Sequence, residues 1–206
     1  MLQDSARLQA LEASQIYKAL IKWHMKKVKP ILHQEKLNEA KDKIEEVMGP
    51  RPMNEKLLKG YKSLKIPLQI KYHMRGMLTG KIKCGSYWHK IPGLAKRVLC
   101  SACKKIDNLE IMETKQHLWL ECERNGRLQT WETAKRICQK STDREWPIMS
   151  IGIIRGHAAL KFEIDLIKDS DGLRILISMS IWAIWKSRNG RAILNQNVLA
   201  QELQRP

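Results

Sequence analysis

Hydrophobic residues recur every three or four positions along much of this chain, the spacing that forms one face of an α-helix. The clearest stripe precedes Gly49-Pro50, which should end the helix, and consists of Leu37, Ala40, Ile44 and Val47. Similar stripes predict helices over residues 54–61, 70–78 and 128–138. Most of the regular structure is therefore expected to be helical.

The closing helix is expected to begin near Ser170 or Asp171 and to end at Asn189-Gly190, a sequence that commonly terminates helices. Between residues 81 and 99 the periodicity is lost, and glycine and proline interrupt the chain, so a loop region is predicted there. No long segment alternates with the two-residue period of a strand. The pattern predicts a mostly α fold, with short helices around an irregular central loop region.

Four candidate metal ligands lie in and just after that region. Cys100 and Cys103 are separated by two residues, so both thiolates can converge on one ion from a short turn. His117 follows after 13 residues and Cys122 after four more, and Thr114 can cap a short helix that holds His117 in its first turn. One nitrogen and three sulfur ligands suit a single tetrahedral, structural zinc ion. The central region is therefore expected to be zinc-stabilised.

The alternative interpretation is that the three cysteines are small core residues and His117 is a satisfied surface histidine. The remaining cysteines, Cys84 and Cys138, are expected to be buried thiols, and His89 is a substitute ligand nearby. A catalytic zinc is disfavoured, because protein side chains fill all four positions and no Glu stands where a hydrolytic base would be needed.

Basic residues are concentrated in the sequence that leads into the cysteines. The chain has a net charge of +17, and 13 lysines and arginines but no acidic residue occur between Glu55 and Asp107. Such a concentration of positive charge favours a polyanionic partner, most commonly nucleic acid, although a solvated lysine face is the alternative. We therefore expect residues 56–106 to bind RNA or DNA. The residues expected to contact phosphate are Lys81, Lys83, Lys90, Lys96, Arg97, Lys104 and Lys105.

Two aromatic residues, Tyr87 and Trp88, lie among these lysines and could stack on exposed bases. The alternative for Trp88 is local packing beneath the metal-binding loop. Trp131, Trp182 and Trp185 recur at helical spacing and are expected in the core.

Three sequences stand out together: Trp88-His89-Lys90-Ile91-Pro92-Gly93, the pair Cys100-x-x-Cys103, and Glu113-Thr114-x-x-His117-Leu118-x-x-x-Cys122. They resemble the reverse-transcriptase zinc-binding domain from the C-terminal part of LINE-type (non-LTR) retrotransposon polyproteins. The later Trp131, Trp146-Pro147 and Ile181-Trp182-x-x-Trp185 are similar to the fungal versions in particular. The resemblance implies that these three cysteines and His117 bind zinc, and that the chain handles nucleic acid beside a reverse transcriptase. One departure is Lys104, which stands where zinc knuckles often place a glycine with positive φ, so strain is expected there.

The chain contains neither the adjacent aspartates of a polymerase nor the grouped carboxylates of RNase H. The sequence therefore predicts a non-catalytic, zinc-stabilised nucleic-acid-binding module, a detached or truncated C-terminal piece of a retrotransposon reverse transcriptase. A zinc-ordered protein-interaction scaffold and an inactive retroelement relic are the alternatives.

Three segments are expected along the chain. They are a helical N-terminal segment over residues 1–50, a basic arm with the zinc-binding module over 51–140, and a helical C-terminal segment over 141–206. No apolar export signal is apparent, and the most apolar stretch is too short to cross a bilayer. An intracellular location, nuclear or cytoplasmic, without secretion or a membrane partner, is therefore expected.

Overall fold

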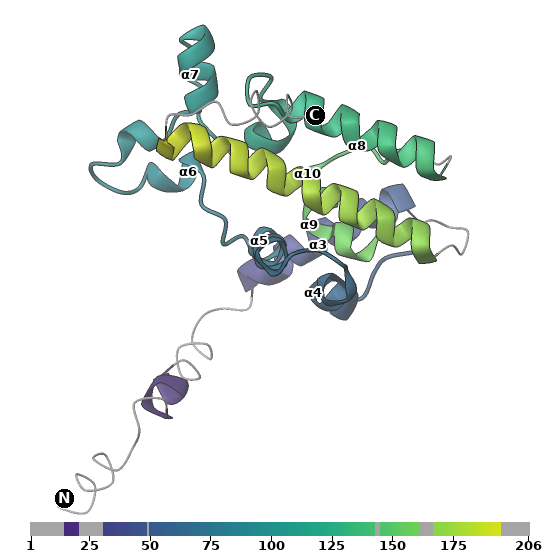
Figure 1. The fold of residues 1–206 in the computed structure, drawn as a ribbon. Coiled ribbons are helices and arrows are strands. Elements are labelled where there is room, and N and C mark those ends of the chain that lie inside the picture. Colours follow the sequence, from purple (N-terminus) through teal and green to yellow (C-terminus); the bar gives the residue numbers. More distant parts are fainter. Residues whose placement is uncertain (1–14, 21–30, 49, 143–144, 161–166, 195–206) are drawn as a thin grey trace, which may run out of the picture. The chain divides into compact units, whose positions relative to one another are not determined.

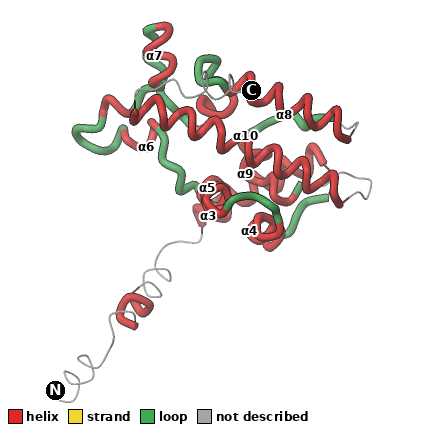
Figure 2. The backbone as a smooth tube through the Cα atoms, viewed as in Figure 1, coloured by secondary structure: helices red, strands yellow, loops and turns green. Residues whose placement is uncertain are grey.

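The computed structural model describes residues 15–20, 31–48, 50–142, 145–160 and 167–194 (Figure 1). The chain divides into two compact units, residues 1–35 and 36–206. In the first unit residues 15–20 are helical, while the rest of the N-terminal segment up to residue 30 lies outside the described residues. The described part is mostly α-helical, which confirms the predicted fold class (Figure 2).

The five longest of the described helices follow the hydrophobic stripes. From residue 31 onward the helices are α3 (Ile31–Met48), α4 (Asn54–Ser63), α5 (Leu68–Leu78), α6 (Gly85–Trp88), α7 (Ser101–Asp107), α8 (Arg127–Thr142), α9 (Ile151–Gly156) and α10 (Ile167–Leu194), with the single turns η1 (Ala95–Arg97), η2 (His117–Glu121) and η3 (His157–Ala159). The central region is irregular, as predicted, although the short elements α6, η1 and α7 interrupt it. None of the described helices is both long and apolar enough to cross a membrane.

Helix α10 is longer than predicted, because it does not end at Asn189-Gly190 but continues to Leu194. Two side chains on either side of Asn189-Gly190 are buried against the loop that precedes α8. The hydroxyl of Ser187 lies 3.5 Å from the carbonyl oxygen of Asn125, and Arg191 donates to the same oxygen at 2.7 Å. These tertiary contacts outweigh the cost of a glycine within a helix, about 1 kcal/mol.

Within residues 36–206, α10 is the helix around which the others are arranged (Figure 1). It contacts α5, α7, α8, η2 and η3. One hydrophobic core includes residues from all three expected segments, among them Ala40, Leu57, Met74, Trp119 and Ile177. Trp131 is buried in this core, and Trp182 and Trp185 pack against it, as predicted. The core positions α10 so that its C-terminal half lies beside the cysteine-rich segment.

Two histidines are buried in this core in their neutral form. The Nδ1 atom of His157 donates to the carbonyl oxygen of Ile154 at 2.8 Å, which leaves Nε2 to accept from the hydroxyl of Ser178 at 2.7 Å. The ring of His73 lies among Trp119, Trp182 and Trp185. Burial lowers the pKa of both histidines to about 4.

These histidines should make the fold sensitive to mild acid. Their pKa is about 4 in the folded chain and 6.5 in the unfolded chain, so the unfolded state binds more protons between these values. Stability should be complete above pH 6.5 and decrease as the pH falls, by about 1.4 kcal/mol for each histidine at pH 5.5. Urea unfolding at pH 7.5 and 5.5 measures the loss. The variant His157→Gln should lack the part of this pH-dependent loss that is due to His157. If its stability still depends on pH as that of the parent does, His157 is not a source of the acid sensitivity.

Candidate metal centre

The four predicted ligands come together at one buried point. The ligand atoms of Cys100, Cys103, His117 and Cys122 all lie within 4.8 Å of one another. The Sγ atom of Cys122 is 3.7 Å from that of Cys100 and 3.6 Å from that of Cys103, and the latter is 3.5 Å from Nε2 of His117. The cysteines are free thiols rather than disulfides. This group could hold a metal ion, as the sequence predicted.

These distances can be compared with the edges of a metal-centred tetrahedron. Bonds of about 2.3 Å to sulfur and 2.0–2.1 Å to nitrogen place two sulfurs about 3.8 Å apart, and sulfur and nitrogen about 3.6 Å apart. The three separations given above agree with these edges to within 0.2 Å. A disulfide would instead require about 2.05 Å between sulfurs. The donor set and its spacing are therefore compatible with zinc.

The three cysteine ligands have almost no apolar core of their own. They form a small buried cluster with Ala102 that is separate from the main core, whereas Leu118 and Trp119, next to His117, belong to the main core. A cluster this small adds little hydrophobic stabilisation to the segment that carries Cys100 and Cys103. A metal ion bonded to the four side chains would fix that segment to the turn of η2.

The first pair of ligands is positioned by a helix rather than by a strained turn. Cys100 precedes α7, and Cys103 lies in its first turn. The prediction of strain at Lys104 is wrong, because Lys104 is helical and its amide donates to the carbonyl oxygen of Cys100 at 3.0 Å. The positive φ occurs at Asn108 instead, where the left-handed conformation (φ 55°) ends α7.

The second pair is positioned by the cap and the wide turn of η2. The hydroxyl of Thr114 accepts from the amide of His117 at 2.9 Å, which confirms the predicted cap. The amide of Cys122 then donates to the carbonyl oxygen of His117 at 2.7 Å, a bond across five residues. Residues five apart in an α-helix are rotated by about 140°. The wider π-type turn closes this angle, so both ligands face the same ion.

A short antiparallel pairing joins the two halves of the site. The amide of Cys100 donates to the carbonyl oxygen of Ile111 at 2.7 Å, and that of Glu113 donates to Val98 at 2.9 Å, around a bridge between Leu99 and Met112. The first ligand is thereby hydrogen-bonded to the segment that leads into η2. The site is thus largely arranged by backbone contacts.

Hydrogen bonds between the thiols separate their pKa values. The hydrogen bond with Cys122 lowers the pKa of Cys100 to about 4, and the same bond raises the pKa of Cys122. Burial raises the pKa of Cys103. A metal ion needs all three as thiolates, so binding releases protons and weakens as the pH falls.

Several side chains attach this region to α10. The indole of Trp119, in η2, donates to the carbonyl oxygen of Ile181 at 3.4 Å, and the indole of Trp131 donates back to Trp119 at 2.8 Å. Asn125, just after the ligands, donates to the carbonyl oxygen of Leu118 at 2.6 Å. The ligand-bearing turn is therefore held between α8 and α10.

The strongest attachment, between Glu113 and Arg188, was not predicted from the sequence. Glu113 is 1% exposed, and both of its carboxylate oxygens accept from Nε of Arg188 at 3.0 Å. The carboxylate also accepts from the amide of Gly85 at 3.2 Å. A Cβ at Gly85 would lie 2.1 Å from the carbonyl oxygen of Val98, so only glycine fits this approach. No local pattern links partners this far apart in sequence.

The basic residues predicted to contact phosphate lie on different elements of the central region. Lys81 and Lys83 precede α6, Lys90 follows it, Arg97 lies in η1, and the pair Lys104 and Lys105 lies in α7. All six of these side chains are exposed, whereas that of Lys96 lies outside the described side chains. Lys104 forms an ion pair with Glu110 at 3.2 Å, so part of its charge is already compensated.

The two aromatic candidates differ in their surroundings. Trp88 is half-buried, with the guanidinium of Arg97 5.7 Å from its ring centre and the ring centre of Tyr87 at 5.0 Å in a T-shaped arrangement. Tyr87 is more exposed, and Nζ of Lys83 lies 4.5 Å from its ring centre. Cys84 and Cys138 are buried thiols, as predicted, and His89 is exposed and is not among the four clustered ligands.

Comparisons of the chain with protein-family models, curated proteins and solved structures find no match. The function proposed below therefore rests on the geometry of the site and on the sequence resemblance.

Proposed function

We propose that this chain is a non-catalytic module in which one structural zinc ion orders a basic surface that binds RNA or DNA. The observation that supports it most directly is the group of four buried ligands, whose ligand atoms lie within 4.8 Å of one another, next to a stretch without acidic residues. With three thiolates and one imidazole, zinc is the ion that the donor set favours. Because protein side chains fill all four positions, the ion would not bind a substrate.

The charge of the neighbouring surface supports a polyanionic partner. Between Lys56 and Ile106 the basic side chains are predominantly exposed, and the acids that pair with Lys59 and Lys104 lie outside this stretch. Lysines spread over several elements would contact phosphates along a strand without reading its bases. The binding should therefore be strong at low salt and little dependent on sequence.

The resemblance to the reverse-transcriptase zinc-binding domain gives this proposal a biological setting. Its quoted residues include the four ligands, Thr114 as the cap and the buried Glu113. We take the chain to be a piece of a LINE-type retrotransposon reverse transcriptase, in which it would hold nucleic acid near the polymerase.

A protein-interaction scaffold is the second candidate, and one observation favours it. Four apolar side chains are exposed in the segment after Cys103: Ile106, Leu109, Ile111 and Met112. Exposed apolar residues grouped in this way are typical of protein contacts. A partner such as a reverse transcriptase could cover them.

Salt dependence tests the nucleic-acid proposal. The chain should bind a labelled single-stranded RNA or DNA with an affinity that falls steeply with salt. The triple variant Lys81→Gln/Lys83→Gln/Arg97→Gln should bind more weakly and reduce the slope of log K against log salt by about 2, since each single-strand phosphate contact contributes about 0.7. Fluorescence anisotropy between 50 and 300 mM salt measures both quantities.

The matched control is Lys135→Gln/Arg136→Gln/Lys140→Gln, which removes the same charge from exposed side chains of α8, outside residues 56–106. It should change binding less. An affinity that does not respond to salt, or that is weaker than about 100 μM near physiological salt, would contradict the proposal. A parent that binds no strand but binds a purified reverse transcriptase would favour the scaffold.

A further inference from the structure

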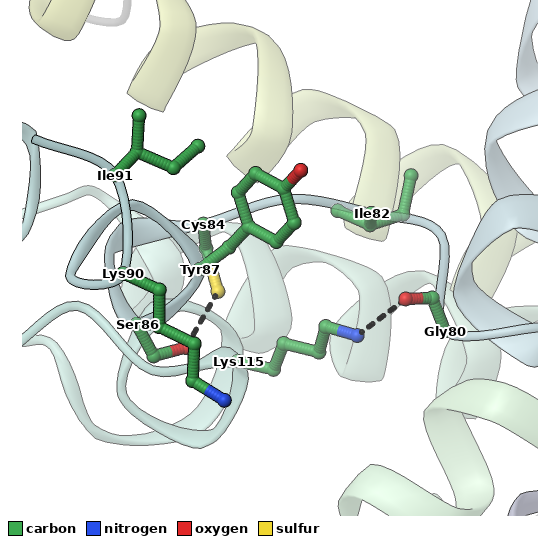
Figure 3. Close-up of a pocket in the computed structure, with 8 residues that line it drawn as sticks. All are labelled: Gly80, Ile82, Cys84, Ser86, Tyr87, Lys90, Ile91 and Lys115. Carbon is green, nitrogen blue, oxygen red and sulfur yellow. Dashed lines mark hydrogen bonds between the residues drawn. The ribbon is translucent and has the colours of Figure 1, made fainter. Parts of the chain in front are cut away.

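A pocket of about 390 Å³ opens between the segment around α6 and the segment that leads into η2 (Figure 3). Its volume lies within the range of about 300–1,000 Å³ typical of small-molecule sites. The lining residues that matter here are Ile82, Ser86, Tyr87, Lys90, Ile91 and Lys115. The metal ligands are not part of this lining, so the pocket is a separate feature of the fold.

The two lysines give the pocket a positive charge. Lys115 is half-buried, and one of its three N–H donors is used on the carbonyl oxygen of Gly80 at 3.3 Å. Lys90 is exposed and belongs to the segment that follows α6, whereas Lys115 belongs to the segment that leads into η2. No acidic side chain is among the described lining residues. An anion would therefore be attracted to this opening.

The remaining lining is suited to a planar apolar group. Figure 3 shows the ring of Tyr87 between Ile91 and Ile82, while the ammonium groups of Lys90 and Lys115 lie apart from the ring and point in different directions. Both isoleucines are half-buried. Tyrosine rings bind nucleic-acid bases by stacking, and apolar neighbours exclude water from such a contact.

We propose that this pocket holds one nucleotide, with its phosphate between Lys90 and Lys115 and its base against Tyr87. The inference deepens the proposed function and rests on it, because a strand bound to the basic surface would insert one of its units here. A free nucleoside monophosphate offers the same phosphate and base. Of the two aromatic residues predicted to stack, Tyr87 rather than Trp88 becomes the stacking residue.

The metal centre would stabilise this pocket indirectly. Lys115 lies between Glu113 and His117, and the amide of Ser86 donates to the carbonyl oxygen of Glu113 at 3.1 Å. The two walls of the pocket are thus joined through Glu113, which also pairs with Arg188. The segment that includes Lys115 is in turn continuous with a metal ligand.

The test compares two double variants of the full chain. Lys90→Gln/Lys115→Gln should weaken binding of a ten-residue oligo(U) by at least tenfold at 100 mM salt and lower the salt slope by about 0.7, since one phosphate contact is lost. The matched control Lys135→Gln/Lys140→Gln removes equal charge from exposed side chains of α8, outside residues 56–106, and should cause a loss of less than threefold. Tyr87→Leu should weaken binding about tenfold without changing the slope. Circular dichroism reports whether the loss of Lys115 impairs folding. If it does, the single variant Lys90→Gln replaces the double variant in the test.

A second titration uses uridine monophosphate, with uridine as its control, and follows the protein by NMR. The parent should bind the monophosphate saturably and uridine far less, and the pocket variant should bind neither. If the parent binds oligo(U) and both double variants lose affinity equally, the pocket is overturned while the proposed function stands. If the parent binds the monophosphate but no strand, the pocket stands and the proposed function fails. Binding of neither ligand would overturn both.

Discussion

Cys122→Ser should abolish stoichiometric zinc binding, whereas Cys138→Ser should leave it intact. Both thiols are free and 1% exposed, so the two variants make the same chemical change in equally buried places. They differ in position, because Cys122 is a member of the four-ligand group and Cys138 lies in α8. Purified parent and Cys138→Ser should contain about one zinc per chain, and Cys122→Ser less than half, by elemental analysis.

The loss of metal should also destabilise the ligand-bearing segment. Metal at a thousand times its dissociation constant stabilises the folded state by about 4 kcal/mol, and structural zinc sites commonly exceed this ratio. Chelation should therefore lower the free energy of unfolding by at least that amount. Hydrogen exchange should rise first between residues 98 and 112, because the buried cluster that includes Cys100 and Cys103 is separate from the main core.

Two results would contradict this expectation. One is a parent that contains less than half an equivalent of zinc after purification in its presence. The other is a Cys122→Ser variant whose zinc content and hydrogen exchange equal those of the parent. Replacement of zinc by cobalt(II) gives an independent check, since the visible spectrum reports thiolate ligation.

Arg188→Met should destabilise the fold by about 3–5 kcal/mol, because it leaves the Glu113 carboxylate buried without its cation. The amide of Gly85 would remain as its hydrogen-bond donor. Methionine retains much of the length of the arginine stem, so the lost packing is small compared with the uncompensated charge. Urea unfolding at pH 7 in excess zinc measures the difference.

The double variant Glu113→Gln/Arg188→Met separates charge from shape. A glutamine oxygen can still accept from Gly85, so the double variant should regain part of the stability lost in Arg188→Met. An exposed ion pair provides the matched control: Arg124→Met breaks the contact with Asp107 and should have a much smaller effect, since water screens it. If Arg188→Met and Arg124→Met lower the free energy of unfolding equally, the buried pair stabilises the fold no more than an exposed pair does. That result would contradict the prediction.

The sequence was sufficient to predict features that depend on neighbouring residues. The spacing of Cys100 and Cys103 and the cap at Thr114 are local, and the structure has both as expected. Stripes of hydrophobic residues located α3, α4, α5 and α8 because each helix buries one face. The fold class followed from the same patterns.

Features that depend on distant partners could not be predicted. Glu113 and Arg188 are 75 residues apart, and neither has a neighbour that would indicate a buried ion pair. The Asn189-Gly190 terminator was overridden by contacts of Ser187 and Arg191 with Asn125. The strain expected at Lys104, where zinc knuckles often have a glycine, is absent because the chain forms a helix from the residue after Cys100.

The pairing between Val98–Cys100 and Ile111–Glu113 has a consequence for the order of assembly. It closes a loop of about a dozen residues, and the ligand contacts span at most 22 residues, whereas the contacts of Trp119 and Glu113 with α10 span 62 and 75. Short loops close with a smaller loss of chain entropy. During synthesis the ligands could thus capture their ion before α10 has left the ribosome, and the helix would then dock onto a segment that is already folded.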